Sequence, residues 1–418
     1  MRILFVTRLI PYPLDSGRNQ RSFHILQSLA AAGEVTMVCY ISNEDQRAHV
    51  THLRKYCSEV HCIAPSKWGH SRLANPSRPA LWAHSLKDCL HPTRPMLLGW
   101  YESPSGKRLV AELCARGYDL VWAERLPGMH LLPPRLSTRV IVDTDDLEHR
   151  KLLHDLRQGD WRLSKPLYWL EYAKLRRLER NLLHKTPYEF TVCSLLDQRV
   201  LGDSRRVSVV PNGIEMPEEP CDIPGAPRDP VFMFLGAMDY RANIDGAQFF
   251  AAHVFPLLRR EAPNARLLIV GRDPVPSIRN LHNGDSIVVT GTVPVIKPYL
   301  DQAIALVAPI RFGGGTRIKI LEAMAYRKPV VSTTIGAEGL EVQAGVHLLI
   351  ADDPAGLAAA CLKLWREPAF SAQIARDAYD LVSRTYTWEA IGRKIEDLVC
   401  RDQYRNSADN IVHASRHT

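Results

Sequence analysis

The chain has 418 residues, is 46% hydrophobic and carries a formal net charge of +8. This length predicts two domains, and the hydrophobic fraction excludes a largely disordered chain. Nine scattered cysteines without a C-x-x-C pair argue against a zinc site and predict a reducing cytoplasm. Because no apolar run reaches membrane-spanning length and residues 3–7 resemble a strand, we expect neither a signal peptide nor a spanning helix.

The charge is unevenly distributed along the sequence. Residues 1–210 hold 31 Lys+Arg against 21 Asp+Glu, whereas residues 211–418 hold 22 against 24. A basic first half indicates an anionic partner, such as a lipid surface, a phosphorylated acceptor or nucleic acid, although a solvated basic surface is the alternative. We do not expect a nucleic-acid partner, because no helix-turn-helix, zinc or aromatic sheet motif is present.

The first half alternates apolar strands with helices, which predicts a parallel sheet. The expected strands are residues 3–7, 35–40, 59–63, 119–123, 139–143, 189–194 and 207–210, with helices at 19–32 and 164–185. In the second helix, one face is expected to carry Leu167, Leu170, Leu175, Leu178 and Leu182. Gly17 and Arg18 follow the first strand, where open α/β sheets bind ligands, so both are candidate ligand contacts.

Tryptophans and basic residues are mixed over residues 66–107, including Trp68, Trp82, Trp100, Arg72 and Arg78. Such a mixture fits a segment that lies at a lipid interface, and an insertion that folds onto its own domain fits equally well.

Three aspartates, Asp143, Asp145 and Asp146, end a predicted strand and could bind a divalent metal. We favour a site without metal, since the second half already offers a phosphate-binding helix start and no acidic ligands at comparable spacing. No other cofactor is expected.

Residues 211–230 read as an irregular connector. A second α/β domain then spans 231–385, with strands at 231–236, 266–270, 287–290, 303–309 and 329–332 and a helix at 243–259. Residues 386–401 predict an amphipathic helix that crosses back to the first domain, and residues 402–418 a disordered tail.

The stretch G-G-G-T-R-I-K-I-L-E-A-M-A at 313–325 predicts a helix with a glycine-led start. Gly313, Gly314 and Gly315 would let the backbone approach a ligand, and Thr316 is placed to cap the first turn. Unpaired N–H groups there favour an anion. Arg317 and Lys319 add positive charge beside Glu322, so a diphosphate and a diol would fit together; an ordinary surface Lys–Glu pair is the alternative.

These residues resemble a known family. V-V-P-N-G-I at 209–214, L-G-A-M-D-Y-R-A-N-I-D-G at 235–246, L-L-I-V-G at 267–271, V-T-G-T-V at 289–293 and the glycine-led helix are similar, in order and spacing, to retaining, B-type glycosyltransferases of family four. The form of the helix start resembles sugar transferases of bacterial exopolysaccharide clusters. The resemblance implies an α/β fold with two Rossmann-like domains facing across a cleft. It places the acceptor in residues 1–210 and the nucleotide sugar in 231–385.

The resemblance also assigns residues. Glu322 matches the second glutamate of the family's E-x7-E motif, which holds the nucleotide ribose, whereas the first glutamate falls on Gly314. The family's loop Arg and Lys fall on Ala237 and Ala242, so we infer that Arg317 and Lys319 grip the diphosphate instead. The family's histidine has no clear match near Glu124, Arg125 or His130. The expected catalytic residues are Arg317, Lys319 and Glu322, and the expected donor contacts are those three with Gly17, Arg18, Gly236, Asn243, Val293, Gly313, Gly314, Gly315 and Thr316.

The predicted activity is retaining, metal-independent sugar transfer from a nucleotide sugar to a saccharide or polyprenyl-linked acceptor in exopolysaccharide synthesis. The expected location is the cytoplasm, at the inner face of the membrane if the basic domain binds anionic lipid. A sugar-nucleotide 2-epimerase and a non-catalytic, nucleotide-sugar-binding subunit are the alternatives, the latter because of the missing glutamate and loop charges.

Overall fold

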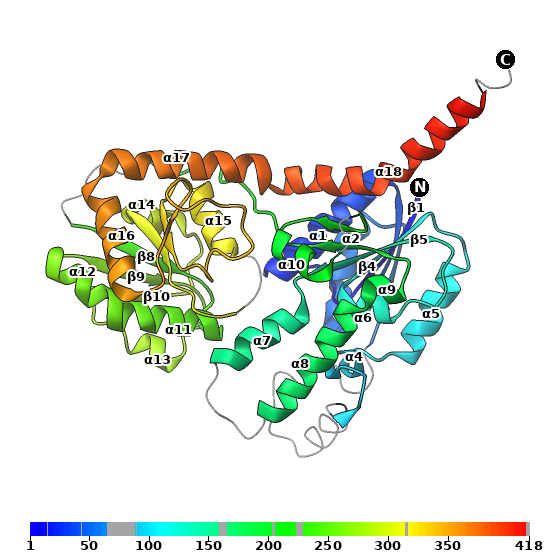
Figure 1. Cartoon of the computed structure of the whole chain (residues 1–418), viewed down its shortest axis with the longest axis horizontal. Coiled ribbons are helices and arrows are strands. Elements are labelled where there is room, and N and C mark those ends of the chain that lie inside the picture. Colours follow the sequence, from blue (N-terminus) through cyan, green and yellow to red (C-terminus); the bar gives the residue numbers. More distant parts are fainter. Residues whose placement is uncertain are drawn as a thin grey trace. The chain divides into compact units, whose positions relative to one another are not determined.

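The computed structural model describes residues 1–14, 16–42, 44–64, 88, 90–158, 165–202, 205–222, 229–313 and 317–414, of which 155, 157, 158 and 402–414 by backbone alone. The chain forms two compact units, Met1–Asn212 with Glu389–Thr418, and Gly213–Trp388. In each unit helices flank a parallel sheet (Figure 1). The expected α/β fold with two Rossmann-like domains is confirmed.

The first unit is built on a seven-stranded sheet of order β3-β2-β1-β4-β5-β6-β7. Its strands are β1 (Arg2–Thr7), β2 (Glu34–Tyr40), β3 (Glu59–Ile63), β4 (Leu120–Glu124), β5 (Arg139–Asp145), β6 (Glu189–Val192) and β7 (Val207–Val209). All pairings are parallel, and β1 pairs with β4 so that Val6 lies opposite Ala123. The strands are apolar on both faces because helices cover both faces.

The helices of this unit include several that the sequence did not predict. They are α1 (Gly17–Ala32), a 3₁₀ turn (Glu44–His49), α2 (Val50–Leu53), α4 (Met96–Trp100), α5 (Pro104–Cys114), α6 (Arg125–His130), α7 (Glu148–Gln158), α8 (Lys165–Arg180), α9 (Leu182–Lys185) and α10 (Leu195–Leu201). The expected helix over 164–185 is interrupted at Asn181, which separates α8 from α9.

The buried face of α8 matches the predicted leucine face only in part. Leu175 is buried and Leu178 packs against the core, but Leu170 is exposed, and Glu171, Lys174 and Glu179 are buried. Lys174 pairs with Glu171 at 2.7 Å, and Glu179 accepts hydrogen bonds from the first N–H groups of α7. Buried polar groups are tolerated here because each has a partner, which periodicity alone does not reveal.

The segment expected at a lipid interface is only partly described, since residues 65–87 and 89 lie outside the described residues. Its described end folds onto the unit: Leu98 is buried, and Leu97 and Trp100 pack against the core. For Leu97, Leu98 and Trp100 the insertion alternative is therefore correct.

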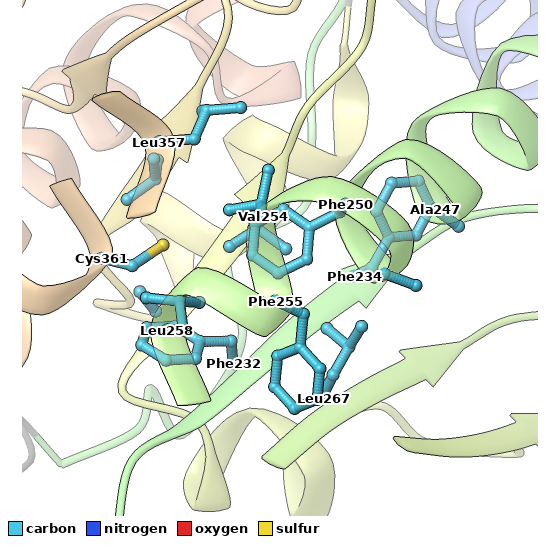
Figure 2. Packing of buried hydrophobic residues seen from close by; sticks show 14 of the residues in the cluster. Phe232, Phe234, Ala247, Phe250, Val254, Phe255, Leu258, Leu267, Leu357 and Cys361 are labelled. Carbon is cyan, nitrogen blue, oxygen red and sulfur yellow. The ribbon is translucent and has the colours of Figure 1, made fainter. Parts of the chain in front are cut away.

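The second unit is built on a six-stranded parallel sheet of order β10-β9-β8-β11-β12-β13. Its strands are β8 (Val231–Leu235), β9 (Arg266–Val270), β10 (Ile287–Gly291), β11 (Ala305–Ala308), β12 (Val330–Ser332) and the unpredicted β13 (Leu349–Ile350). Figure 2 shows Phe232 and Phe234 of β8 packed against Phe250 and Phe255 from the covering helix.

That covering helix replaces the single helix expected over 243–259. It consists of α11 (Arg241–Phe249), a π-helical turn (Phe250–Val254) and α12 (Phe255–Glu261). Pro256, which lacks an N–H, stands in the first turn of α12, so the regular hydrogen-bond ladder cannot continue through it. The remaining helices are α13 (Pro276–Arg279), α14 (Lys297–Gln302), α15 (Ile318–Ala325), α16 (Pro354–Arg366) and α17 (Pro368–Thr385).

The last helix, α18 (Trp388–Ala414), returns to the first unit. Its predicted apolar face is buried, and Arg139 of β5 donates hydrogen bonds to the carbonyls of Leu398 and Val399. The helix continues past residue 402, so the predicted disordered tail is wrong as far as 414; no Gly or Pro follows Gly392 to end it. Among the described helices, none is long and apolar enough to cross a membrane.

A buried ion pair joins α1 to the sheet in the first unit. Arg21 donates to both carboxylate oxygens of Asp143, at 3.0 and 2.6 Å, and to the carbonyl of Pro211 at 3.2 Å. Thr191 donates to the same carboxylate at 2.7 Å. Since Arg21 and Asp143 are both buried, either charge left alone would be strongly unfavourable.

We expect Arg21→Met to destabilise the first unit by about 3–5 kcal/mol, because Asp143 would remain as a buried, uncompensated carboxylate. Urea unfolding followed by circular dichroism measures this. The double variant Arg21→Met/Asp143→Leu should recover part of the loss, and the exposed Arg199→Met is the control. A loss no larger than that of the control would contradict the assignment.

Candidate functional site

The strand order of the second sheet reverses between β8 and β11, which lie side by side at its centre. The chain leaves β8 toward β9 and leaves β11 toward β12, in opposite directions along the sheet. Loops that diverge in this way leave room for a ligand at the carboxyl edge. The loop after β8 holds Gly236, and the loop after β11 holds Gly313 and leads into α15.

Three predicted residues meet at this edge. The amine of Lys319 donates to Oδ1 of Asn243 at 2.5 Å, and Nδ2 of Asn243 donates to the carbonyl of Ala237 at 2.8 Å. A Cβ on Gly236, whose φ is +154°, would lie 2.6 Å from Nδ2 of Asn243 and 2.8 Å from Nζ of Lys319. Only glycine therefore allows Asn243 and Lys319 to approach the end of β8.

The environment of Lys319 weakens its hold on a proton. Burial and the neighbouring Arg317 lower the pKa of Lys319 to about 7, although Glu322 opposes the shift. The amine also lies 4.6 Å from the centroid of the Phe234 ring. An incoming anion would restore the charge that burial disfavours, so this amine is suited to an anionic ligand.

Helix α15 begins at Ile318, with Arg317 in the capping position, and the side chain of Arg317 makes no capping hydrogen bond. The predicted cap by Thr316 falls on residues 314–316, which lie outside the described residues. Arg317 donates to the carbonyl of Gly313 at 2.6 Å, and Gly313 has a φ of +96°. This hydrogen bond links the glycine turn to the residue that precedes α15.

Glu322 lies on α15 one turn beyond Lys319. Burial raises the pKa of Glu322 to about 7, and Lys319 opposes the shift. Within the described part of the chain, no donor bonds to its carboxylate, in contrast to Glu124, Glu171 and Glu179. A half-buried carboxylate of this kind can accept hydrogen bonds from a diol.

The other predicted donor contacts lie elsewhere. Val293 packs against the cluster that includes Ile320 and Leu321 of α15. Gly17 and Arg18 open α1 in the first unit, where Ser16 caps the helix by accepting from the N–H of Asn19 at 3.3 Å. The structure therefore brings Gly236, Asn243, Gly313, Arg317, Lys319 and Glu322 into one unit, and Gly17 and Arg18 into the other.

Two further residues lie at these edges that the sequence patterns did not indicate. Tyr240 places its hydroxyl 3.0 Å from where a Cβ of Gly313 would lie, so it faces the same glycine turn. Arg8 directly follows β1 and is buried. Its position at the end of the first strand was a visible signal.

The acidic cluster of the first unit is an ion-pair network. Asp143 pairs with Arg21, Asp145 with Arg125, and Asp146 with Lys151 at 3.3 Å. Ligand atoms of Asp145, Asp146 and Cys193 lie within 4.8 Å of one another, so a metal would find the right atom types. Burial alone would raise the pKa of Asp146, but Lys151 and a hydrogen bond from Cys193 lower it to about 2. Because the carboxylates are already compensated by cations, we assign no metal to them.

Comparison with known proteins bears on this geometry. Residues 229–367, about one third of the chain, match the family model described as glycosyl transferases group 1. A curated relative, an uncharacterised 44.6 kDa protein in the cps region of Klebsiella pneumoniae, is 24% identical over 162 residues. The match covers 37% of this chain and 42% of that relative, so the chain spans less than half of it.

Solved structures resemble the whole chain. Sucrose-phosphate synthase from Thermosynechococcus elongatus aligns over 97% of this chain and 100% of its own, with a TM-score of 0.65 and 17% identity. HepE from Anabaena, in complex with UDP and glucose, aligns over 96% and 100%, with a TM-score of 0.60 and 14% identity. Residues 229–367 therefore resemble the group 1 glycosyl transferases, and the whole chain has the two-domain Rossmann-like fold of B-type glycosyltransferases.

Proposed function

We propose that this protein transfers a sugar from a nucleotide-sugar donor to a saccharide or polyprenyl-linked saccharide, with retention of configuration. The observation that carries the proposal is the position of Lys319. Its amine reaches across from α15 to the Gly236–Asn243 loop. The family resemblance expects loop cations there, but this chain has Ala237 and Ala242. Lys319 thus supplies positive charge where the diphosphate is expected.

Two relatives support the choice of substrates. HepE was solved with UDP and glucose and also with UDP-glucose, which supports a nucleotide-sugar donor. The relative from a cps region supports a role in surface-polysaccharide synthesis.

The site can perform the transfer without a metal. Glu322 accepts hydrogen bonds from the ribose hydroxyls, and Lys319 with the start of α15 stabilises the negative charge that grows on the leaving diphosphate. An oxocarbenium-like carbon then meets the acceptor hydroxyl on the face that the diphosphate leaves, and the leaving phosphate takes the proton. Retention rests on the family resemblance.

For the proposed transfer, we predict a loss of turnover in the variant Lys319→Met. We expect kcat to fall about 10²–10³-fold, since a preorganised charge at the departing group is removed. Release of nucleoside diphosphate is measured with a panel of nucleotide sugars, with and without acceptor lipids. Lys363→Met, an exposed lysine on α16 that contacts the Phe370 ring, is the control.

The outcomes separate the three functions considered. Transfer requires acceptor-dependent release of nucleoside diphosphate. Reversible rearrangement of the donor sugar would indicate an epimerase, and binding without turnover a non-catalytic subunit. Equal activities of Lys319→Met and Lys363→Met would contradict the placement of the diphosphate.

A further prediction concerns the pH dependence of UDP binding. Affinity for UDP should be highest near pH 7, because Lys319 loses its proton above that value and Glu322 gains one below it. Each limb should approach a tenfold change per pH unit far from the pKa. Isothermal titration calorimetry from pH 5.5 to 9 measures both limbs.

A separate variant tests each side of this pH profile. Lys319→Arg keeps the charge at all these pH values and should flatten the alkaline limb only. Glu322→Gln removes the titrating group, should weaken UDP about 10–100-fold and should flatten the acid limb only. If either variant left its limb unchanged, the residue would not be the group that titrates.

The first unit offers a surface suited to the expected anionic membrane. At the start of α8, Tyr168, Trp169 and Leu170 are 43%, 44% and 38% exposed. Arg176 and Arg177 follow on the same helix. Aromatic and basic residues together favour the headgroup region of a bilayer.

We expect Trp169→Ser to reduce sedimentation with vesicles that contain anionic phospholipid, several-fold at physiological salt, because the largest exposed ring is lost. Leu195→Ser, which removes an equally exposed side chain on α10, is the matched control. Equal effects of both substitutions would argue against a role of α8 at the membrane.

A further inference from the structure

The first sheet has the same reversal of strand order as the second, and there it brings arginines together. The order β3-β2-β1-β4-β5-β6-β7 reverses between β1 and β4. Arg8 is the first residue after β1, and Arg125 the first after β4. Because Val6 lies opposite Ala123, Arg8 and Arg125 leave neighbouring strands at the same height on the carboxyl edge. Ligands of open α/β sheets bind at such an edge.

Arg8 differs from the other buried arginines of this edge. Arg8 is only 8% exposed, and no described residue forms an ion pair with it; its guanidinium still reaches the surface, since no atom of Arg8 is among the fully buried atoms that lack a partner. By contrast, Arg21 holds Asp143, and Arg125 holds Asp145 and Glu148. A largely buried charge without a compensating anion is costly, which points to a partner supplied from outside the chain.

The carboxylates nearest to Arg8 are already engaged. Both oxygens of Glu124 accept from hydroxyls, one from Thr7 and one from Ser22. Glu148 accepts from Arg125 at 3.2 Å. Burial and repulsion by Arg125 lower the pKa of Arg8 to about 10, despite attraction from Tyr101, Glu148 and Glu124. The guanidinium therefore stays charged at neutral pH while lacking a hydrogen-bonded anion.

A third arginine comes close to the same point. Burial raises the pKa of Tyr101, and Arg8, Arg18 and Arg125 all act against that rise. Arg18 stands in the first turn of α1. The hydroxyl of Tyr101 thus marks a position that three guanidinium groups influence, and an anion there would meet positive charge from β1, α1 and β4.

We propose that Arg8, together with Arg18, binds the diphosphate of a prenyl-diphosphate-linked acceptor at the carboxyl edge of the first sheet. This inference rests on the proposed function and names the chemical class of the acceptor. The planar fork of Arg8 suits the oxygens of a phosphate, which it can bind in pairs. The donor diphosphate is assigned to Lys319 in the other unit, so Arg18, which the sequence predicted to contact the donor, is proposed here to contact the acceptor instead.

The test uses the full chain and two probes that share the diphosphate group. Farnesyl diphosphate represents the acceptor and UDP the donor, and calorimetry measures both at fixed ionic strength. Arg8→Gln should weaken farnesyl diphosphate at least tenfold and change UDP less than twofold. Arg108→Gln, an exposed arginine on α5, should change neither.

A thermal unfolding curve distinguishes binding from a structural role. Arg8→Gln should not lower the melting temperature, because it removes an unpartnered buried charge next to Arg125. Rescue of farnesyl diphosphate binding by Arg8→Lys, at least in part, is expected for a charge contact.

Three results would overturn the proposal: wild-type protein that does not bind farnesyl diphosphate, equal affinity in Arg8→Gln, or a parallel loss of UDP. The last would assign Arg8 to the donor. If UDP binding and sugar transfer were absent while Arg8→Gln still lost farnesyl diphosphate, the proposed function would fail and the anion site would stand.

Discussion

The reversal of strand order in a parallel sheet is the constraint on which both units depend. It occurs between β1 and β4 and again between β8 and β11. At each reversal the connections leave the sheet in opposite directions, so that backbone ends and side chains near the carboxyl edge are not covered by a crossover. Gly236, Asn243 and Lys319 gather at one such edge, and Arg8 and Arg125 at the other. The residues proposed to bind ligands therefore lie at the two carboxyl edges that no crossover connection covers.

Burial of charge distinguishes structural from ligand-binding cations at these edges. Arg21 is buried with a carboxylate that accepts two of its hydrogen bonds, and the pair fastens α1 to β5. Lys319 donates to one neutral acceptor, Asn243, and burial together with the neighbouring Arg317 lowers its pKa to about 7. Binding of a phosphate by Lys319 therefore breaks no ion pair with a carboxylate. Binding of a phosphate by Arg21 would first have to break its buried ion pair with Asp143. The same contrast separates Arg8 from Arg125.

Prediction from sequence succeeded where a local pattern reports directly on structure. Apolar runs identified twelve of the thirteen strands in the described part of the chain, and the glycine-led stretch identified α15 with Lys319 and Glu322. Prediction from sequence failed where the position of a residue depends on a partner elsewhere in the chain. The leucines of α8 predicted only part of the buried face, because Glu171 and Lys174 are also buried and pair with each other. The helix expected over 243–259 contains a π-helical turn, and the expected tail is helical as far as Ala414.

The sequence by itself determined the two α/β units, the glycine turns and the charged residues near them. The reason is that the spacing of apolar residues and the positions of glycine and proline act on structure over only a few residues. Only the tertiary structure decided which of those charges are compensated. Asp143, Asp145 and Asp146, which could have bound a metal although a site without metal was favoured, are ion-paired, whereas Arg8, which the sequence did not single out, forms no ion pair with a described residue. The reason is that an ion pair such as Arg21–Asp143 joins residues far apart in the chain, and no local pattern encodes that distance.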